Sequence, residues 1–163
     1  MNRFARTAAV AAVTATALLG ATAGTATSTK VMPFTAKYSG TAVVKIVDNI
    51  ANITATGTGT GTLLGAGKIS GKGTGDSSVR PCVPFSGPGT LTGTAGTKLT
   101  FKVVSGAQGC GDEEGQVFSV SGRISIVSGA GKLAKAKGSL KFVGVYDRGK
   151  GTFSVKFIGS LTV

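Results

Sequence analysis

The feature that most constrains the fold is a strict alternation of apolar and polar residues in the C-terminal half of the chain. Residues 153–163 place apolar side chains at every second position except Gly159, and residues 98–104 and 117–127 follow the same pattern, with Gly122 as the exception. Successive side chains of a β-strand point to opposite faces, so this period of two predicts strands with one buried face. The apolar members are Leu99, Phe101, Val103, Phe118, Val120, Ile124, Ile126, Phe153, Val155, Phe157, Leu161 and Val163.

Turn residues and β-branched residues predict further strands along the rest of the chain, where helix signals are scarce. We expect these strands over residues 33–48, with a break or bulge at Gly40, and over 50–63, 67–74, 89–95 and 140–146. Strands joined by short turns favour an all-β, antiparallel β-barrel of about eight strands, because closure removes exposed strand edges. A two-sheet β-sandwich is the alternative, since strand number and alternation do not distinguish the two folds.

The N-terminus has the pattern of a secretory signal peptide. Arg3 and Arg6 precede an uncharged apolar run over residues 7–19, and small residues permit cleavage after Ala23 or Ala26. The run is shorter than the roughly 20 apolar residues that a membrane-spanning helix needs. The sequence therefore predicts a secreted, extracellular protein without a membrane anchor.

We expect a signal peptide over residues 1–26 and one secreted domain over residues 27–163, a normal length for a single domain. Removal of Arg3 and Arg6 lowers the formal net charge from +12 to +10, so the domain stays strongly basic. Such a surface attracts polyanions, among them wall polymers, acidic polysaccharides, anionic lipids and nucleic acids. Alternatively, the lysines only keep the protein soluble and block pairing at strand edges.

Two cysteines, Cys82 and Cys110, follow the predicted signal peptide. An even number of cysteines in an exported chain predicts a disulfide. It would close a loop of about 29 residues and stabilise the domain by roughly 3 to 4 kcal/mol. A metal site at this pair is not expected, because the chain has no C-x-x-C spacing and no histidine.

Residues 129–138 read Gly-Ala-Gly-Lys-Leu-Ala-Lys-Ala-Lys-Gly. This segment resembles the G-x-G-K/R-F-x-x-A-x-G signature of dirigent and allene-oxide-cyclase-like barrels, and the Thr/Gly-rich first half looks like secreted actinobacterial proteins of this barrel type. Leu133 stands where the family has an aromatic residue, and the acid and arginine site residues of the plant proteins have no counterpart by motif. The resemblance implies an eight-stranded barrel with a central cavity, and it does not imply the plant proteins' chemistry.

The absence of histidine from the sequence excludes several classes of mechanism. Ser-His-Asp and Cys-His catalysis, histidine metal sites and histidine pH switches all need that side chain. Neither a phosphate-binding loop nor a G-x-G-x-x-G motif occurs, despite 27 glycines. The sequence therefore implies no cofactor, no metal and no assigned catalytic residue.

Half of all acidic residues lie together at Asp112, Glu113 and Glu114, two residues after Cys110. The predicted disulfide would draw this loop toward Arg80. The carboxylates could contact a ligand at a barrel mouth, bind a cation weakly or act as a general acid or base. The alternative is a solvated turn with a local ion pair to Arg80, which would contribute little if exposed.

Phe85 lies in a proline-rich segment with Pro81, Pro84 and Pro88. We expect this segment to be stiff and irregular. It could form a lid or rim that presents Phe85 to a ligand, or Phe85 could cap one end of the core. Tyr146, in the strand over residues 140–146, is a further weak candidate for a site.

Two repeated patterns have an ordinary structural interpretation beside a functional one. Every second residue from Thr54 to Thr62 is threonine, so one strand face carries a ladder of hydroxyls, either outward or lining a cavity. Lys135, Lys137 and Lys141 share a face if their strand begins that early. No aromatic residues lie between these lysines, so specific nucleic-acid binding is not supported.

The favoured functional interpretation is a non-catalytic binding module for a small apolar ligand in the cavity or for an anionic surface polymer. One alternative is a cavity-templated enzyme or dirigent-like protein that steers cyclisation or coupling, using Asp112, Glu113, Glu114 and Tyr146. Another is a structural surface protein without a ligand. A pocket with convergent carboxylates would favour the enzyme, and a barrel filled by Phe118, Phe142, Phe153 and Phe157 would favour the structural protein.

Overall fold

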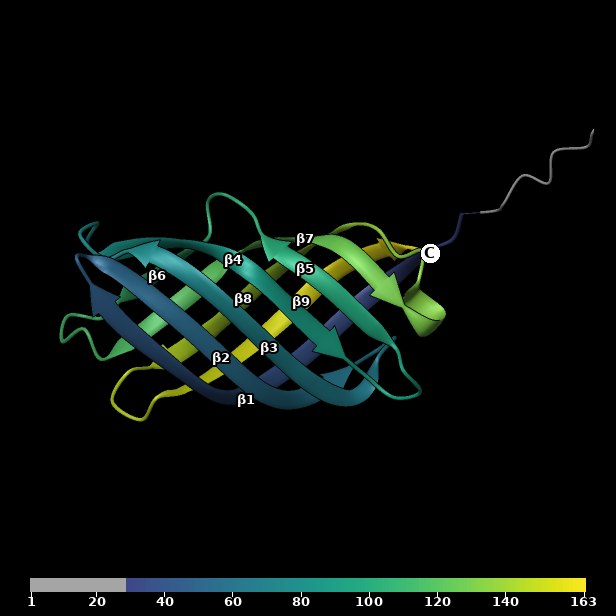
Figure 1. The fold of residues 1–163 in the computed structure, drawn as a ribbon, viewed down its shortest axis with the longest axis horizontal. Coiled ribbons are helices and arrows are strands. Elements are labelled where there is room, and N and C mark those ends of the chain that lie inside the picture. Colours follow the sequence, from purple (N-terminus) through teal and green to yellow (C-terminus); the bar gives the residue numbers. More distant parts are fainter. Residues whose placement is uncertain (1–28) are drawn as a thin grey trace, which may run out of the picture.

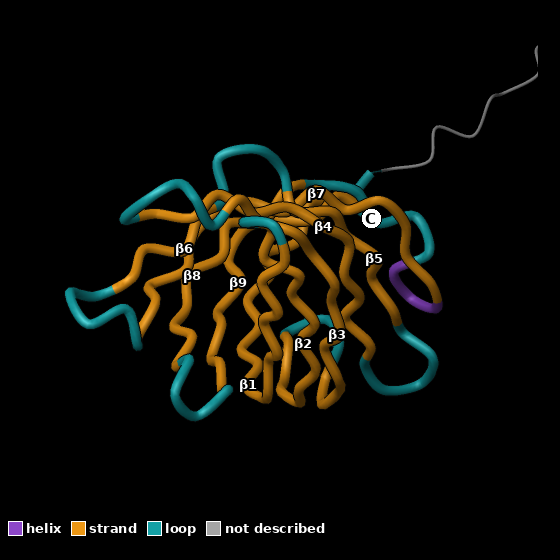
Figure 2. The backbone as a smooth tube through the Cα atoms, turned by 60° about the vertical axis from the view of Figure 1, so that its left-hand side comes forward, coloured by secondary structure: helices purple, strands orange, loops and turns teal. Residues whose placement is uncertain are grey.

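The chain forms a closed antiparallel β-barrel in a computed structural model that describes residues 29–163 (Figure 1). Within this range the regular structure is nine strands and one short 3₁₀ helix (Figure 2). The predicted signal peptide, residues 1–26, lies outside the described residues. Over residues 29–163, no helix has the length and apolar character needed to cross a membrane.

The barrel wall consists of eight strands paired in the order β3-β2-β1-β9-β8-β7-β5-β4, and pairing of β3 with β4 closes it. The ninth strand, β6, pairs with β4 and β7 beyond the end of β5, so β5 and β6 share one position in the wall. Closure confirms the predicted barrel over the sandwich. The elements are β1 (Val31–Val47), β2 (Ile50–Gly61), β3 (Gly65–Asp76), β4 (Cys82–Thr92), β5 (Lys98–Val103), β6 (Gln108–Gly111), β7 (Val117–Ala130), η1 (Gly131–Leu133), β8 (Ser139–Asp147) and β9 (Thr152–Thr162).

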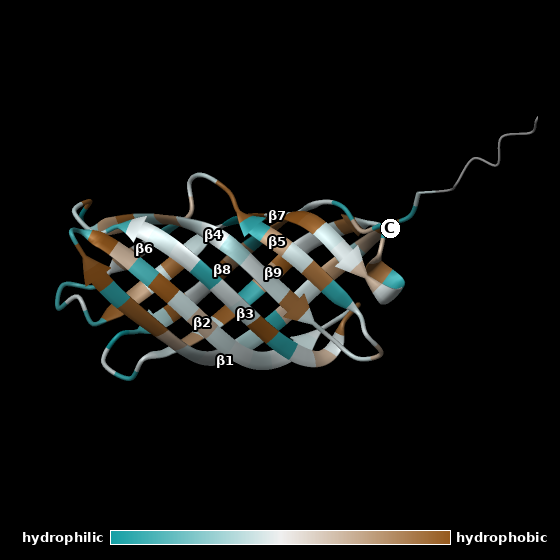
Figure 3. Ribbon diagram, viewed as in Figure 1, coloured by the Kyte–Doolittle hydropathy of each residue, from teal (hydrophilic) through white to brown (hydrophobic). Residues whose placement is uncertain are grey.

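The predicted alternation is confirmed in the wall, where buried and exposed positions alternate along β7 and β9 and the core is apolar. Figure 3 shows apolar and polar residues interspersed along the ribbons of the wall. Some apolar residues are exposed outside, among them Val43, Val143, Val145 and Ile158. The threonine ladder of β2 points outward, with glycine or small apolar residues at the inward positions. All seven phenylalanines of residues 29–163 lie at buried or half-buried positions. The barrel therefore has a hydroxyl-rich exterior and an aromatic interior.

Two details of the strand prediction were wrong. Strand β4 begins at Cys82 rather than at residue 89. Proline fits an extended backbone, and the residues between the prolines still form backbone hydrogen bonds. The Phe85 N–H, for example, donates to the Ala107 carbonyl at 3.1 Å. Strand β6 was missed, since its four residues are too few to show alternation. The strand predicted over residues 140–146 is confirmed as β8, Ser139–Asp147. Because η1 and a turn precede this strand, the condition for a shared face is not met, and Lys135 and Lys137 do not share a strand face with Lys141.

The predicted break at Gly40 is also wrong, because β1 keeps its register with β2 and β9 through this residue. Gly40 is required for another reason. A Cβ atom here would collide with the carbonyl oxygen of Thr56 and the Cα atom of Gly57 on β2. Glycine therefore permits a close approach of two strands rather than a bulge.

The two ends of the barrel differ. At the acidic end, defined by the loops over residues 48–49, 77–81, 112–116 and 148–151, lie all six carboxylates of the chain. At the packed end lie η1, the start of β1 and the C-terminus (Figure 1). Large apolar side chains fill the packed end completely, each at most 3 % exposed: Phe34, Leu64, Leu91, Leu99, Leu133, Leu140 and Leu161.

Tyr38 of β1 is buried in the core, and its ring lies edge-on to Phe157 with centroids 6.4 Å apart. Its hydroxyl is the buried side-chain atom of residues 29–163 that has no hydrogen-bond partner. An unsatisfied buried polar group costs about 1 to 3 kcal/mol. We therefore expect the Tyr38→Phe variant to be more stable than the native chain by about 1 kcal/mol or more in urea unfolding at neutral pH.

Tyr38 also predicts that the native chain and the Tyr38→Phe variant differ in how their stability changes at high pH. Burial raises the pKa of Tyr38 above its ordinary value of about 10. Above pH 10 the unfolded chain releases this proton while the folded chain retains it, so the stability of the native protein falls as pH rises from about 10 through the raised pKa. The Tyr38→Phe variant should lack this part of the loss in unfolding curves at pH 9 and 11. An equal loss in both proteins would contradict the assignment.

Candidate functional site

A cavity of about 250 Å³ occupies the interior of the barrel toward the acidic end. This volume is just below the roughly 300 to 1,000 Å³ of typical small-molecule sites, so it suits a small ligand. Its walls are almost entirely apolar. The side chains that form them include Ala42, Val44, Ile46, Ala51, Ile53, Ala55, Ile69, Val83, Phe85, Phe101, Val103, Phe118, Val120, Phe142, Phe153, Val155 and Phe157.

The cavity exists because glycines occupy inward positions on one side of the wall. Gly71 and Gly73 of β3 and Gly109 of β6 all line it. Elsewhere an aromatic ring fills the space above an inward glycine, as the Phe101 ring does at Gly89. At Gly71, by contrast, an added Cβ would have only ordinary contacts, 3.6 Å from the Pro88 carbonyl oxygen and 3.9 Å from the Gly89 Cα atom. This part of the wall therefore faces free space.

Aromatic rings form another part of the lining. The ring centroids of Phe85 and Phe142 lie 6.1 Å apart, as do those of Phe142 and Phe157, and those of Phe101 and Phe157 lie 5.9 Å apart. Such tilted contacts between rings are favourable beyond their buried area. The phenylalanines expected to fill the barrel in a purely structural protein, Phe118, Phe142, Phe153 and Phe157, instead line the cavity.

The polar side of the cavity lies at its rim. Arg80, in the loop between β3 and β4, and Arg148, directly after β8, both line the cavity and are exposed. Tyr146 and Ser77 complete this side. The ion pair within residues 29–163 joins Lys150 to Asp147, so neither arginine is neutralised by a carboxylate there. The rim of an apolar cavity thus carries two arginines that form no ion pair within residues 29–163.

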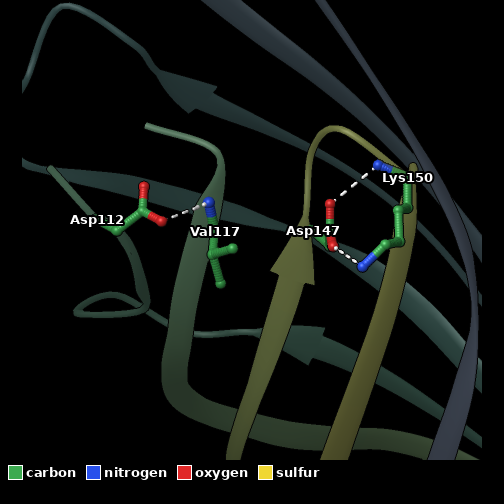
Figure 4. Close-up of polar contacts among 4 residues, drawn as sticks. All are labelled: Asp112, Val117, Asp147 and Lys150. Atoms are coloured by element: carbon green, nitrogen blue, oxygen red, sulfur yellow. Dashed lines mark hydrogen bonds and ion pairs between the residues drawn. The ribbon is translucent and has the colours of Figure 1, made fainter. Parts of the chain in front are cut away.

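The predicted acidic cluster does not line the cavity. The carboxylate of Asp112 accepts a hydrogen bond from the backbone N–H of Gln116 at 2.8 Å. It accepts another from the backbone N–H of Val117 at 3.2 Å (Figure 4). Glu113 and Glu114 are exposed in the same turn. The ion pair with Arg80 that we considered does not form in the described chain. Asp112 therefore stabilises the β6–β7 turn, and the three carboxylates do not converge on one point.

Two other carboxylates at this end also stabilise turns. The backbone N–H of Lys150 donates to Asp147 at 2.9 Å and its ammonium lies 3.0 Å from the same carboxylate, which lowers the pKa of Asp147 (Figure 4). The Ser78 hydroxyl and backbone N–H donate to Asp76 and lower its pKa. Both groups stay ionised at neutral pH.

The disulfide between Cys82 and Cys110 is confirmed. The two residues lie directly opposite each other on β4 and β6, with Cα atoms 3.9 Å apart. Their neighbours Val83 and Gly109 line the cavity. The bond therefore holds the short strand β6 in the wall of the site.

Of the sequence-predicted site residues, Arg80, Phe85 and Tyr146 lie together at the cavity. Phe85 belongs to strand β4 rather than to an irregular lid. The sequence interpretation missed Arg148 and the wall formed by β1 and β2. Alternation over residues 42–46 and 51–55 could have indicated that wall, whereas no sequence signal places Arg148 beside Arg80.

Comparison with known proteins gives no match to a family model, to a curated protein or to a solved structure. A barrel fold hosts many unrelated functions, so the fold alone does not define an activity. The functional argument therefore depends on the cavity and its rim.

Proposed function

We propose that the mature chain is a secreted, non-catalytic binding protein that holds a small apolar ligand in the barrel cavity. The observation that carries this proposal is a cavity of about 250 Å³ with an almost wholly apolar lining. Apolar surface removed from water on binding contributes about 25 cal/mol per Å². A concave apolar site with a few polar groups at one side is the usual form of a small-molecule site.

The rim supports a ligand with an anionic group at one end. Arg80 and Arg148 lie on the cavity lining and are not paired with carboxylates in residues 29–163. A guanidinium group donates paired hydrogen bonds to carboxylate and phosphate groups. A ligand with an apolar body in the cavity and a carboxylate at the rim would satisfy both parts of the site.

The lining supports binding rather than acid–base chemistry. None of the carboxylates of residues 29–163 lines the cavity, and the sequence has no histidine. The lining residues with an ordinary role in proton transfer are Tyr146 and Lys72, and Lys72 is at an exposed position of β3. A dirigent-like or cyclase-like reaction, which the resemblance of residues 129–138 would suggest, has no convergent acid groups to use here.

Secretion is part of the same proposal. The signal-peptide pattern of residues 1–26 and the disulfide both support it, because disulfides persist in oxidising compartments outside the cytoplasm. In this setting the protein would collect its ligand outside the cell.

Calorimetric titration with straight-chain alkanoates and the matching alcohols tests the proposal. We expect saturable one-to-one binding whose affinity rises about fourfold per methylene until the cavity is full. Burial of apolar surface should give a negative heat-capacity change. The Arg80→Gln, Arg148→Gln double variant should lose the preference for the acid over the alcohol while retaining the dependence on chain length. Absence of binding by every member of both series would refute the proposal.

A further inference from the structure

Five cationic side chains lie next to one another on the outer wall of the barrel, on five adjacent strands. One of them lies on each of the strands β5, β7, β8, β9 and β1. At the usual spacing between strands, the set extends over about 20 Å of the wall. All five are exposed, and their neighbours in the strands point into the barrel. We name this set the basic belt: Lys102, Arg123, Lys141, Lys156 and Lys37.

Four members of the basic belt form like-charged pairs in the least favourable geometry that a sheet offers. Arg123 lies directly opposite Lys141 across β7 and β8. Lys156 lies directly opposite Lys37 across β9 and β1. Cβ atoms of directly opposite residues are about 4.5 to 5.5 Å apart, and like charges there destabilise the sheet. The isolated barrel thus bears two repulsive pairs side by side.

No carboxylate of residues 29–163 relieves this repulsion, because all six lie at the acidic end. Lys156 is four residues along β9 from Thr152, which lies opposite Asp147. Four residues of strand span about 13 Å, beyond the roughly 8 to 10 Å over which salt screens exposed charges. The charges of the belt are therefore compensated by solvent ions alone.

The ordinary reasons for surface lysines do not account for this arrangement. Lysine blocks unwanted pairing at sheet edges, but the closed barrel has no long free edge. Solubility is served by charges of both signs interspersed over the surface. Here all six acids lie at one end of the barrel, and none is interspersed among the cations of the belt.

A groove of about 340 Å³ lies at the centre of the belt. Arg123 and Lys141 line it together with the hydroxyl residues Ser105 and Ser121. Gly106, Gly122, Phe142 and Val143 complete its surface. The groove therefore offers two cations and two hydroxyls to one group of a ligand, beside the core cavity but on the opposite face of the wall.

We propose that the basic belt is a second binding site, for a linear acidic polysaccharide that lies across β5, β7, β8, β9 and β1. An anionic chain would neutralise both like-charged pairs. Hydroxyl-bearing outward residues lie beside the cations, namely Thr35, Ser39, Ser121 and Ser154, and these match sugar hydroxyl groups. Two exposed apolar residues, Val143 and Ile158, lie directly opposite Lys156 and Lys141 and offer contact to the apolar faces of sugar rings.

This partner fits better than the other polyanions. Every phenylalanine and tyrosine of residues 29–163 lies at a buried or half-buried position, so the wall offers no ring on which nucleic-acid bases could stack. The belt follows the curved wall of a barrel (Figure 1), which a flexible chain can follow and a flat membrane surface cannot. The proposal is independent of the cavity ligand.

Titration of the mature protein with alginate oligomers, a linear polyuronate, tests the proposal. Replacement of all five belt residues by glutamine should weaken binding at least tenfold at low salt. The matched control replaces five exposed lysines outside the belt, Lys68, Lys98, Lys132, Lys135 and Lys137, by glutamine, which gives the same net charge. The control should retain the native affinity within about twofold, since net attraction alone would weaken both variants equally.

The same variants give readouts that do not depend on the polymer. Removal of the like-charged pairs should raise the melting temperature of the belt variant, so weakened binding cannot be attributed to unfolding. The belt variant should also bind alkanoates in the cavity with unchanged affinity. Equal weakening in belt and control variants, or tighter belt-dependent binding to single-stranded DNA or to anionic vesicles than to alginate, would overturn the proposal.

Discussion

The Gly71→Leu substitution is expected to weaken alkanoate binding at least tenfold while the barrel stays folded. Position 71 lies at an inward point of β3 on the cavity lining. An added Cβ atom there would have only ordinary contacts, of which the closest is 3.6 Å to the Pro88 carbonyl oxygen. The rest of the leucine side chain must then extend into the cavity, in the space proposed for the ligand.

The matched control is Ser70→Leu, one residue earlier on the same strand. Ser70 is exposed, so this leucine would extend into solvent. It should leave the alkanoate affinity unchanged. Titration of both variants by calorimetry makes the comparison, and equal weakening in the two variants would mean that the ligand does not occupy the cavity.

The stability of the Gly71→Leu variant provides a second check. Replacement of glycine in a strand removes freedom from the unfolded chain and adds buried apolar surface. We therefore expect urea unfolding to show unchanged or increased stability. An independent variant, Gly109→Val on β6, should act in the same way, since its Cβ would lie 3.5 Å from the Val120 Cγ1 atom. Retained binding in both variants would contradict the cavity assignment.

The sequence alone predicted the class of fold because alternation is a local property. Residues 117–127 and 153–163 each show their buried face without reference to the rest of the chain. Strand β6 escaped prediction for the complementary reason, because its residues take their conformation from pairing with β4 and β7. The start of β4 escaped because its prolines indicate irregular structure when they are considered alone.

The cavity could not be located from the sequence, because the space beside an inward glycine can be either filled by another side chain or left free. At Gly89 the ring of Phe101 fills the space, and at Gly71 nothing does. The difference depends on which side chains face each glycine across the closed barrel, and closure brings together strands that are distant in the chain. The sequence shows where the glycines and phenylalanines are along the chain, but it does not show which of them face one another inside the barrel.

The acidic cluster shows the converse error, in which a conspicuous motif has a local role. Asp112 bonds to backbone N–H groups within five residues, so it stabilises its own turn. The rim charges that do line the cavity, Arg80 and Arg148, are single residues in different loops. Proximity in sequence therefore gave less information about the site than the closed barrel, which brings the loop between β3 and β4 and the end of β8 to the same cavity.

Removal of the disulfide by the Cys82→Ala, Cys110→Ala double substitution is expected to lower stability by about 3 kcal/mol, from the entropy of the loop it closes. The loss should be concentrated at one place in the wall. Strand β6 has four residues, and its pairing with β4 covers three of them. Without the covalent bond, β6 should separate from β4 before the rest of the barrel opens.

Hydrogen exchange locates this effect. Faster exchange is expected at residues 108–111 and at residues 118–121 of β7, which pair with β6, while the packed end keeps its protection. Because Val83 and Gly109 line the cavity next to the two cysteines, the same variant should bind alkanoates more weakly. The Thr90→Ala variant, a change on the same strand away from the disulfide, should retain both protection and binding. Uniform loss of protection over all strands would show instead that the disulfide stabilises the whole barrel and that β6 does not open on its own.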